Sequence, residues 1–246
     1  MMPPTAPHER ILVALDVDSE DAAFALVRQL AGRVGGFKVG LELVNVAGPD
    51  VFARLRDGGA ERVFYDAKFH DIPNTVAGAV RAAARRGVWM VNVHASGGAA
   101  MLRAAREAAD AASAAAGVAA PLLIGVTMLT SIDESTLNND LRVPGSVADQ
   151  VAHLALLCQT CGLDGVVASP HEVGAIREAC GPEFVTVIPG VRPVGSDPHD
   201  QARVATPSIA VRDGAHYLVV GRAITGAPDP AQAADAITRE IAEAVP

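Results

Sequence analysis

The sequence has few cysteines and aromatic residues, and it lacks long apolar runs. Three cysteines stand in 246 residues, and aromatic side chains make up 4% of the chain. No apolar run reaches the roughly 18 residues of a membrane-spanning helix, and residues 1–8 lack the apolar core of a signal peptide. We therefore expect a cytoplasmic protein with no membrane partner, in which residues 1–9 form a flexible amino-terminal extension.

Positive charge is also limited. Lysine and arginine total 20 against 28 aspartate and glutamate residues, which gives a net charge of −8 and a pI near 5.3. A protein that binds a nucleic-acid backbone gathers basic residues on one face, whereas here they are scattered along the chain. We therefore expect no nucleic-acid partner.

Cys158 and Cys161 form an isolated C-x-x-C pair. A structural zinc site needs four ligands, and no second cysteine or histidine pair follows at ligand spacing. The segment 151–158 has the composition of a buried helix, in which cysteine packs as a small hydrophobic residue. The sequence therefore predicts a structural role for this pair and no metal site.

Apolar, β-branched segments alternate with Ala-rich segments of helical period, a pattern typical of repeated βα units. The first four predicted strands begin near residues 11, 37, 63 and 89, at a spacing of 26 residues, and four more cover 122–127, 165–169, 184–189 and 216–221. Ser19 and Asn74 are predicted helix caps. The predicted helices cover 19–32, 49–57, 73–86, 99–116, 147–161, 170–180, 207–213 and 230–244.

Eight parallel strands form either an open sheet or a closed barrel. The count of eight, and the absence of a G-x-G-x-x-G turn after the first predicted strand, favour closure. We therefore predict an α/β protein, a (β/α)8 TIM barrel that forms one domain over residues 1–246. In such a barrel the carboxyl ends of the strands meet at one mouth, where enzymes of this fold place their sites.

Charged residues stand near the ends of the first three predicted strands. Asp16 follows the first, Lys38 lies in the second, and Asp66, Lys68 and Asp71 close the third. A buried lysine stays charged only beside an acid, so we expect Lys38 to pair with Asp66 or Asp71. A catalytic charge array is favoured over a salt-bridge network that merely closes the barrel, because several strand ends converge on one mouth.

Glycine and arginine follow the last two predicted strands. Arg192 lies in Pro-Gly-Val-Arg-Pro after the seventh, and Arg222 lies in Val-Gly-Arg-Ala-Ile-Thr after the eighth. Barrels often bind phosphate with these two loops, and arginine adds charge-assisted hydrogen bonds. The loops 128–146 and 191–206 exceed usual connections, and we expect the second to close on a bound phosphate.

Six segments of the sequence, taken in order, form a specific pattern: Ala14-Leu-Asp16, Phe37-Lys-Val-Gly40, Asp66-Ala-Lys68-Phe-His-Asp71-Ile-Pro-Asn-Thr75, Val126-Thr-Met-Leu-Thr-Ser131, Pro189-Gly-Val-Arg192-Pro193 and Val220-Gly-Arg222-Ala-Ile-Thr225. Through these segments, and over nearly its whole length, the chain resembles the bacterial orotidine 5′-phosphate decarboxylases. The resemblance implies conversion of orotidine 5′-phosphate to uridine 5′-phosphate (UMP) and carbon dioxide, the last step of de novo UMP synthesis, without a cofactor.

The resemblance also implies roles for individual residues. Lys68 would protonate C6 of the pyrimidine, Asp66 would lie against the departing carboxylate, and Lys38 and Asp71 would complete the catalytic set. The protein would be a homodimer with shared active sites, in which Asp71 and Thr75 reach into the site of the other subunit. Substrate contacts would come from Asp16, Lys38, Thr75, Thr130, Arg192, Gln201, Gly221 and Arg222.

Two other functions fit parts of the pattern. A magnesium-dependent sugar-phosphate decarboxylase or aldolase of the same superfamily would share the Asp-x-Lys-x-x-Asp motif. Its metal site would require a further carboxylate near the mouth of the barrel, where Lys38 stands instead. A non-catalytic phosphate-binding barrel would have no reason to place Lys68 between two acids.

Overall fold

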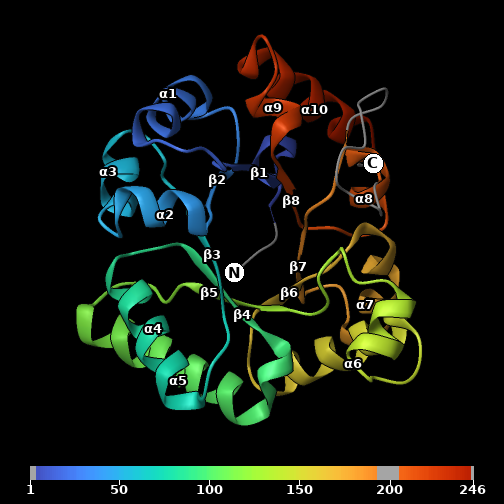
Figure 1. The fold of residues 1–246 in the computed structure, drawn as a ribbon. Helices are drawn as coiled ribbons and strands as arrows, with labels where there is room; N and C mark the ends of the chain where they lie inside the picture. Colours follow the sequence, from blue (N-terminus) through green and yellow to red (C-terminus); the bar gives the residue numbers. More distant parts are fainter. Residues whose placement is uncertain (1–3, 193–204, 245–246) are drawn as a thin grey trace.

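The computed structural model describes residues 4–192 and 205–244. Within these residues, eight parallel strands form a closed barrel in sequence order, with helices around it (Figure 1). This confirms the predicted (β/α)8 TIM barrel. The strands are β1 Ile11–Ala14, β2 Gly36–Val39, β3 Val63–Phe69, β4 Met90–His94, β5 Leu122–Val126, β6 Gly165–Val167, β7 Val185–Ile188 and β8 Tyr217–Val220.

Helices follow the strands on the outside of the barrel (Figure 1). Short 3-10 helices lie at Pro7–Arg10, Ala95–Gly97 and Pro170–Glu172, and a π-helical turn lies at Thr136–Asp140. The α-helices are α1 Glu20–Leu30, α2 Leu41–Ala47, α3 Val51–Asp57, α4 Pro73–Arg85, α5 Gly98–Ala116, α6 Val147–Thr160, α7 Val173–Cys180, α8 Pro207–Arg212, α9 Arg222–Thr225 and α10 Pro230–Ala244.

Helix α2 was not predicted, and one of the two predicted caps is wrong. Gly48, at φ +72°, ends α2 and separates it from α3. The predicted helix 49–57 corresponds to α3, the second of these two short helices. Ser19 caps α1 by accepting a hydrogen bond from the Ala22 backbone N–H at 3.4 Å. Asn74 is no cap, because α4 already begins at Pro73, whose fixed φ and missing N–H suit a first helical position.

The barrel interior is filled by apolar side chains from alternating strand positions. The inner cluster comprises Leu12, Ala14, Phe64, Met90, Leu122, Ile124, Val187, Tyr217 and Val219. A larger buried cluster lies between the strands and the surrounding helices. Because inward-facing side chains fill a barrel of eight strands, the interior is a packed core rather than a pore, and polar groups gather above it at the mouth.

The amino-terminal segment is partly structured. Residues 7–10 form a 3-10 helix, and the Glu9 carboxylate accepts hydrogen bonds from the backbone N–H groups of Thr5 and Ala6, each at 3.1 Å. Arg10 Nη1 donates to the Ala215 carbonyl oxygen at 3.1 Å. Residues 4–9 of the expected flexible extension therefore pack onto the barrel, and residues 1–3 lie outside the described residues.

The cysteines have the structural role that the sequence predicts. Cys158 and Cys161 are buried and free, and burial raises the pKa of the Cys158 thiol to about 12. Across residues 4–192 and 205–244, His, Cys, Asp and Glu side chains form no group of three that could hold a metal ion. None of the helices in the same ranges is long and apolar enough to cross a membrane.

A buried histidine joins β7 and β8 near their amino-terminal ends. His216 Nδ1 accepts hydrogen bonds from Arg177 Nη2 at 2.7 Å and from the Thr186 backbone N–H at 3.2 Å. Since both partners are donors, Nδ1 carries no proton and the imidazole is neutral. Burial, followed by the charges of Arg177 and Arg10, lowers the pKa of His216 from 6.5 to about 4.

We expect His216 to make the protein less stable in acid. Between pH 6.5 and about 4, His216 binds a proton more readily in the unfolded chain than in the folded protein. The stabilisation is therefore complete above pH 6.5, and the free energy of unfolding should fall by up to about 1.4 kcal/mol per unit as the pH drops toward 4. Urea unfolding measures this slope.

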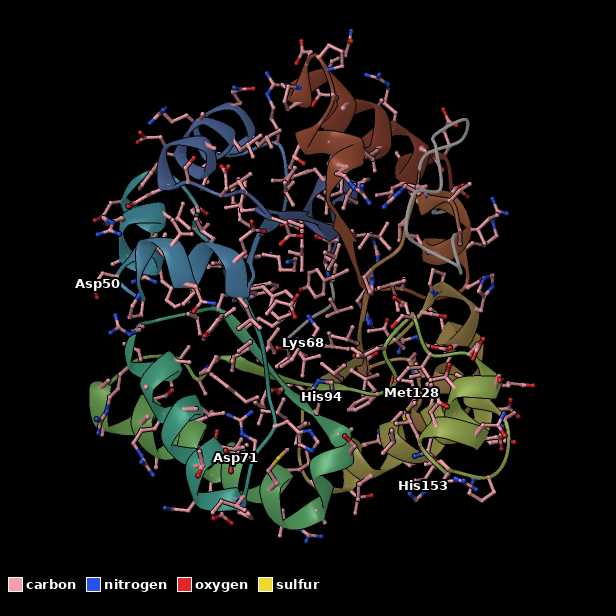
Figure 2. All side chains as sticks on the ribbon, in the orientation of Figure 1. Asp50, Lys68, Asp71, His94, Met128 and His153 are labelled. Carbon is pink, nitrogen blue, oxygen red and sulfur yellow. The ribbon has the colours of Figure 1, made fainter. Side chains whose placement is uncertain are left out.

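The matched control replaces an exposed histidine of α6. His216→Asn, whose amide oxygen keeps an acceptor that does not titrate, should show a shallower pH dependence than the wild type. His153→Asn should keep the wild-type slope, because His153 lies on the surface (Figure 2). Equal slopes in all three proteins would contradict the assignment.

Candidate active site

A cavity of about 480 Å³ opens at the carboxyl ends of the strands. Its floor includes Ala14, Phe64, Val187 and Val219 of the inner cluster. The polar residues that the sequence predicts as site residues line its wall: Asp16, Lys38, Asp66, Lys68, Thr130, Arg192, Gly221 and Arg222. The fold therefore brings together side chains from opposite ends of the sequence.

Four charged side chains alternate in sign across the mouth. Lys38 Nζ lies 2.8 Å from Asp16 Oδ1 and 3.4 Å from Asp66 Oδ2. Lys68 Nζ lies 2.7 Å from Asp66 Oδ1. Neighbouring parallel strands place these residues within reach, since the register pairs Ala14 with Lys38. Lys38 therefore forms an ion pair with Asp66, one of the two acids expected as its partner, and a second ion pair with Asp16.

Asp66 is the buried centre of this charge array. Its side chain is 14% exposed, that of Lys38 8%, and that of Lys68 36%. Burial acts to raise the pKa of Asp66, but the ammonium groups of Lys38 and Lys68 and the hydrogen bonds from Lys68 and Asn92 outweigh it, so the pKa lies below its ordinary value. The carboxylate is therefore ionised at neutral pH.

Asn92 belongs to the site although the sequence analysis missed it. It lies in the middle of β4, is fully buried, and donates through Nδ2 to Asp66 Oδ1 at 2.8 Å. Its Oδ1 accepts a hydrogen bond from the Lys68 backbone N–H at 2.7 Å. The available signal was a single amide between the apolar residues Val91 and Val93 of this strand, since a buried polar residue needs partners.

Asp71 and Thr75 do not line the cavity. Asp71 is exposed, and its Oδ1 accepts a hydrogen bond from the backbone N–H of Ile72 at 2.6 Å. Thr75 is exposed in the first turn of α4. Figure 2 shows Lys68 near the centre of the barrel and Asp71 farther out, beside α4. Neither residue therefore reaches the cavity of its own chain.

The loops after β7 and β8 bring two arginines to the same wall. Gly190, at φ +75°, turns the chain after β7, and Arg192 follows with a nearly buried side chain. Arg222 begins helix α9 directly after Gly221. The Arg192 backbone N–H donates to the Ala205 carbonyl oxygen at 3.0 Å, which holds the two ends of the long loop together. Gln201, and residues 193–204 of the expected lid, lie outside the described residues.

The fold and the site together define a (β/α)8-barrel enzyme with a charged cavity at the strand ends. The family model described as "Orotidine 5'-phosphate decarboxylase / HUMPS family" matches residues 9–237. The chain therefore belongs to the orotidine 5′-phosphate decarboxylase / HUMPS family. The match spans every strand of the barrel and both arginine-bearing loops.

Relatives of known name cover nearly the whole chain. The orotidine 5′-phosphate decarboxylase of Moorella thermoacetica is 56% identical over 233 residues, which are 95% of this chain and 92% of the relative. That of Syntrophotalea carbinolica is 51% identical over 238 residues, 97% of each chain. The crystal structure of the Lactobacillus acidophilus orotidine 5′-phosphate decarboxylase matches with a TM-score of 0.83 and 39% identity, over 94% of this chain and 98% of that one.

Replacing Lys38 should raise the pKa of Asp66. Burial raises this pKa, and the Lys38 ammonium is the largest of the effects that lower it. In Lys38→Met the Asp66 carboxyl should therefore titrate at a higher pH than in the wild type. Carbon-13 NMR of the carboxyl group, assigned by comparison with Asp66→Asn, measures the change.

An ion pair on the surface supplies the control. Arg86, which follows α4, places its Nη1 2.7 Å from Oδ1 of Asp50, which precedes α3. Arg86→Met should leave the titration of Asp66 unchanged, because it removes a cation that does not contact the charge array. An Asp66 pKa that stays at the wild-type value in Lys38→Met would refute the proposed coupling.

Proposed function

We propose that this protein decarboxylates orotidine 5′-phosphate to UMP and carbon dioxide, the last step of de novo UMP synthesis, in the cytoplasm. The observation that carries the proposal is the ammonium of Lys68, which lines the cavity while it is held 2.7 Å from the Asp66 carboxylate. A relative 56% identical to this chain bears the name of this activity. The residues that match the family motifs supply each group that the reaction needs.

Lys68 acts as the acid. The bond between C6 and the substrate carboxylate breaks, carbon dioxide leaves, and the electron pair remains on C6, where no ring carbonyl conveniently delocalises it. The adjacent ammonium stabilises this charge and then transfers a proton to C6, which completes UMP. The resulting neutral amine regains a proton from solvent.

Asp66 holds the ammonium in place and faces the departing carboxylate. Two like charges 4 Å apart repel by about 4 kcal/mol at an effective dielectric constant of 20. The slowest reactions need their barriers lowered by roughly 20 kcal/mol or more. Repulsion between Asp66 and the substrate is therefore a minor contribution. The larger share comes from stabilisation of the carbanion and from binding energy at the phosphate.

The rest of the cavity binds the substrate. Arg192, Gly221 and Arg222 bind the phosphate together with Gln201, because the loops after β7 and β8 are the usual phosphate site of this fold. Asp16 and Lys38 bind the ribose hydroxyls. Thr130, after β5, lies beside the pyrimidine ring. The apolar floor excludes water from the reacting carbon, which strengthens the electrostatic effect of Lys68.

The reaction proceeds without a metal or an organic cofactor. Lys38 Nζ lies between the carboxylates of Asp16 and Asp66, so a cationic side chain stands where a magnesium site would need a further carboxylate. The ammonium groups of Lys38 and Lys68 together balance the two negative charges. This arrangement favours an orotidine 5′-phosphate decarboxylase over a magnesium-dependent sugar-phosphate decarboxylase or aldolase.

The protein works as a homodimer with shared sites. Asp71 and Thr75 are exposed and lie outside the cavity of their own chain, and Ile72 between them is 67% exposed. A large exposed apolar side chain flanked by polar residues fits a subunit interface. Asp71 and Thr75 of one subunit would complete the site of the other.

Lys68→Ala should lose decarboxylation by at least about 10⁴-fold, because it removes both the electrostatic stabilisation and the proton donor. The variant should still bind UMP, since the arginines of the phosphate site remain. Loss of absorbance at saturating orotidine 5′-phosphate, in buffer with EDTA, measures turnover, and calorimetry measures UMP binding. Arg28→Ala, at an exposed cation of α1, should behave as the wild type. Appreciable turnover by Lys68→Ala would refute the assignment.

Mixing two inactive variants tests the shared site. Lys68→Ala and Asp71→Ala should each be inactive alone. In a hybrid dimer, one of the two sites combines an intact Lys68 with an intact Asp71, so subunit exchange should restore activity toward one quarter of the wild-type value. The estimate of about one quarter assumes random pairing, with one good site in half of the dimers. No recovery, despite exchange verified by mass spectrometry, would count against the shared site.

A further inference from the structure

Strand β3 bulges at the point where it carries its charged residues. Between two pairs of facing residues, β3 has three residues and β4 has one, Asn92; the flanking pairs are Tyr65–Val91 and Phe69–Val93. Within the bulge, Lys68 adopts φ +50°, a left-handed conformation that favours glycine. Because a bulge breaks the ladder of backbone hydrogen bonds, the Lys68 N–H needs another partner.

The side chain of Asn92 fills this gap in the ladder. Its Oδ1 accepts from the Lys68 N–H at 2.7 Å, and its Nδ2 donates to Asp66 Oδ1 at 2.8 Å. The amide cannot be flipped, because its NH2 group would then face the Lys68 N–H and its oxygen would face the carboxylate. Asn92 is fully buried, so water does not compete for these bonds.

We infer that Asn92 is a positioning residue for the decarboxylation. It holds the Lys68 backbone in the left-handed conformation and fixes the rotation of the Asp66 carboxylate, so that the ammonium and the carboxylate keep their relative position at the cavity. This inference rests on the proposed function. Asn92 does not line the cavity, so it acts through the two charged residues and not on the substrate.

The proposed role requires a donor and an acceptor on one short side chain. Alanine offers neither group, and it leaves the Lys68 N–H and one Asp66 lone pair unpaired. An ionised aspartate keeps the acceptor, but it replaces the NH2 donor with a carboxylate oxygen that faces the Asp66 carboxylate. A protonated aspartate restores both functions, because its O–H donates to Asp66 while its carbonyl oxygen accepts from Lys68.

The kinetic test uses Asn92→Ala and Asn92→Asp. Asn92→Ala should lower kcat by about 100-fold, the cost of misplacing a catalytic group by about 1 Å, while the dissociation constant of UMP changes by less than about threefold. For Asn92→Asp, the activity relative to wild type should rise about tenfold or more from pH 8.5 to pH 5.5, as the new carboxyl group takes up a proton beside Asp66. Asn139→Ala, at an exposed asparagine in the π-helical turn before α6, should match the wild type.

A spectroscopic measurement keeps the inference testable in a poorly folding variant. Lys38 and Lys68 are the only lysines of the chain, so lysine labelled with nitrogen-15 gives two backbone amide signals. In the wild type the Lys68 amide should exchange with solvent slowly. In Asn92→Asp its signal should shift with the titration of the new carboxyl group, whereas the Lys38 signal should not.

The outcomes separate the inference from the proposed function. Wild-type kcat in Asn92→Ala, a pH-independent activity ratio for Asn92→Asp, or a fast-exchanging Lys68 amide in the wild type would each overturn the positioning role. Equal losses of kcat and UMP affinity in a folded variant would also overturn it, since they indicate a general structural defect. Failure of the wild-type protein to convert orotidine 5′-phosphate would instead overturn the proposed function.

Discussion

The carboxylate of Asp66 is the group on which the geometry of the mouth depends. It contacts Lys38 from β2, Lys68 from its own strand and Asn92 from β4. A buried carboxylate costs several kcal/mol unless it is paired and hydrogen-bonded, so these partners are required together. Parallel strands in a closed barrel bring them together, because their carboxyl ends meet at one edge. The barrel is thus the means by which one buried charge is stabilised from three strands.

The strands, and the convergence of charges at their ends, were predictable from the sequence. Each βα unit repeats an apolar strand and an Ala-rich helix. The strands can be recognised from the sequence alone, because a strand that is buried on both faces requires a continuous apolar run. Asp16, Lys38 and Asp66 stand at the ends of such runs, so closing the barrel is enough to bring them together. The prediction of the fold was therefore sufficient to predict which residues form most of the site.

The features that the sequence did not reveal depend on contacts between distant segments. Asp71 is three residues from Lys68, yet the chain turns into α4 after β3 and carries it away from the cavity, so Asp66 pairs with Lys38 instead. The bulge that makes Asn92 necessary is a property of the register between β3 and β4, which local propensity does not encode. The short helix α2, which was not predicted, ends at Gly48 because this residue adopts a positive φ, which the sequence permits but does not require.

The distribution of cations in the chain separates two electrostatic tasks. All positive side chains except Lys38 and Lys68 are arginines, and both lysines contact the Asp66 carboxylate. A guanidinium stays protonated in proteins and binds phosphate with several fixed donors, which suits Arg192 and Arg222 to a permanent anion. An ammonium is a compact charge that can release a proton. A site that must deliver a proton to carbon therefore needs lysine beside the reacting atom, and an arginine at position 68 would keep the charge while removing the acid.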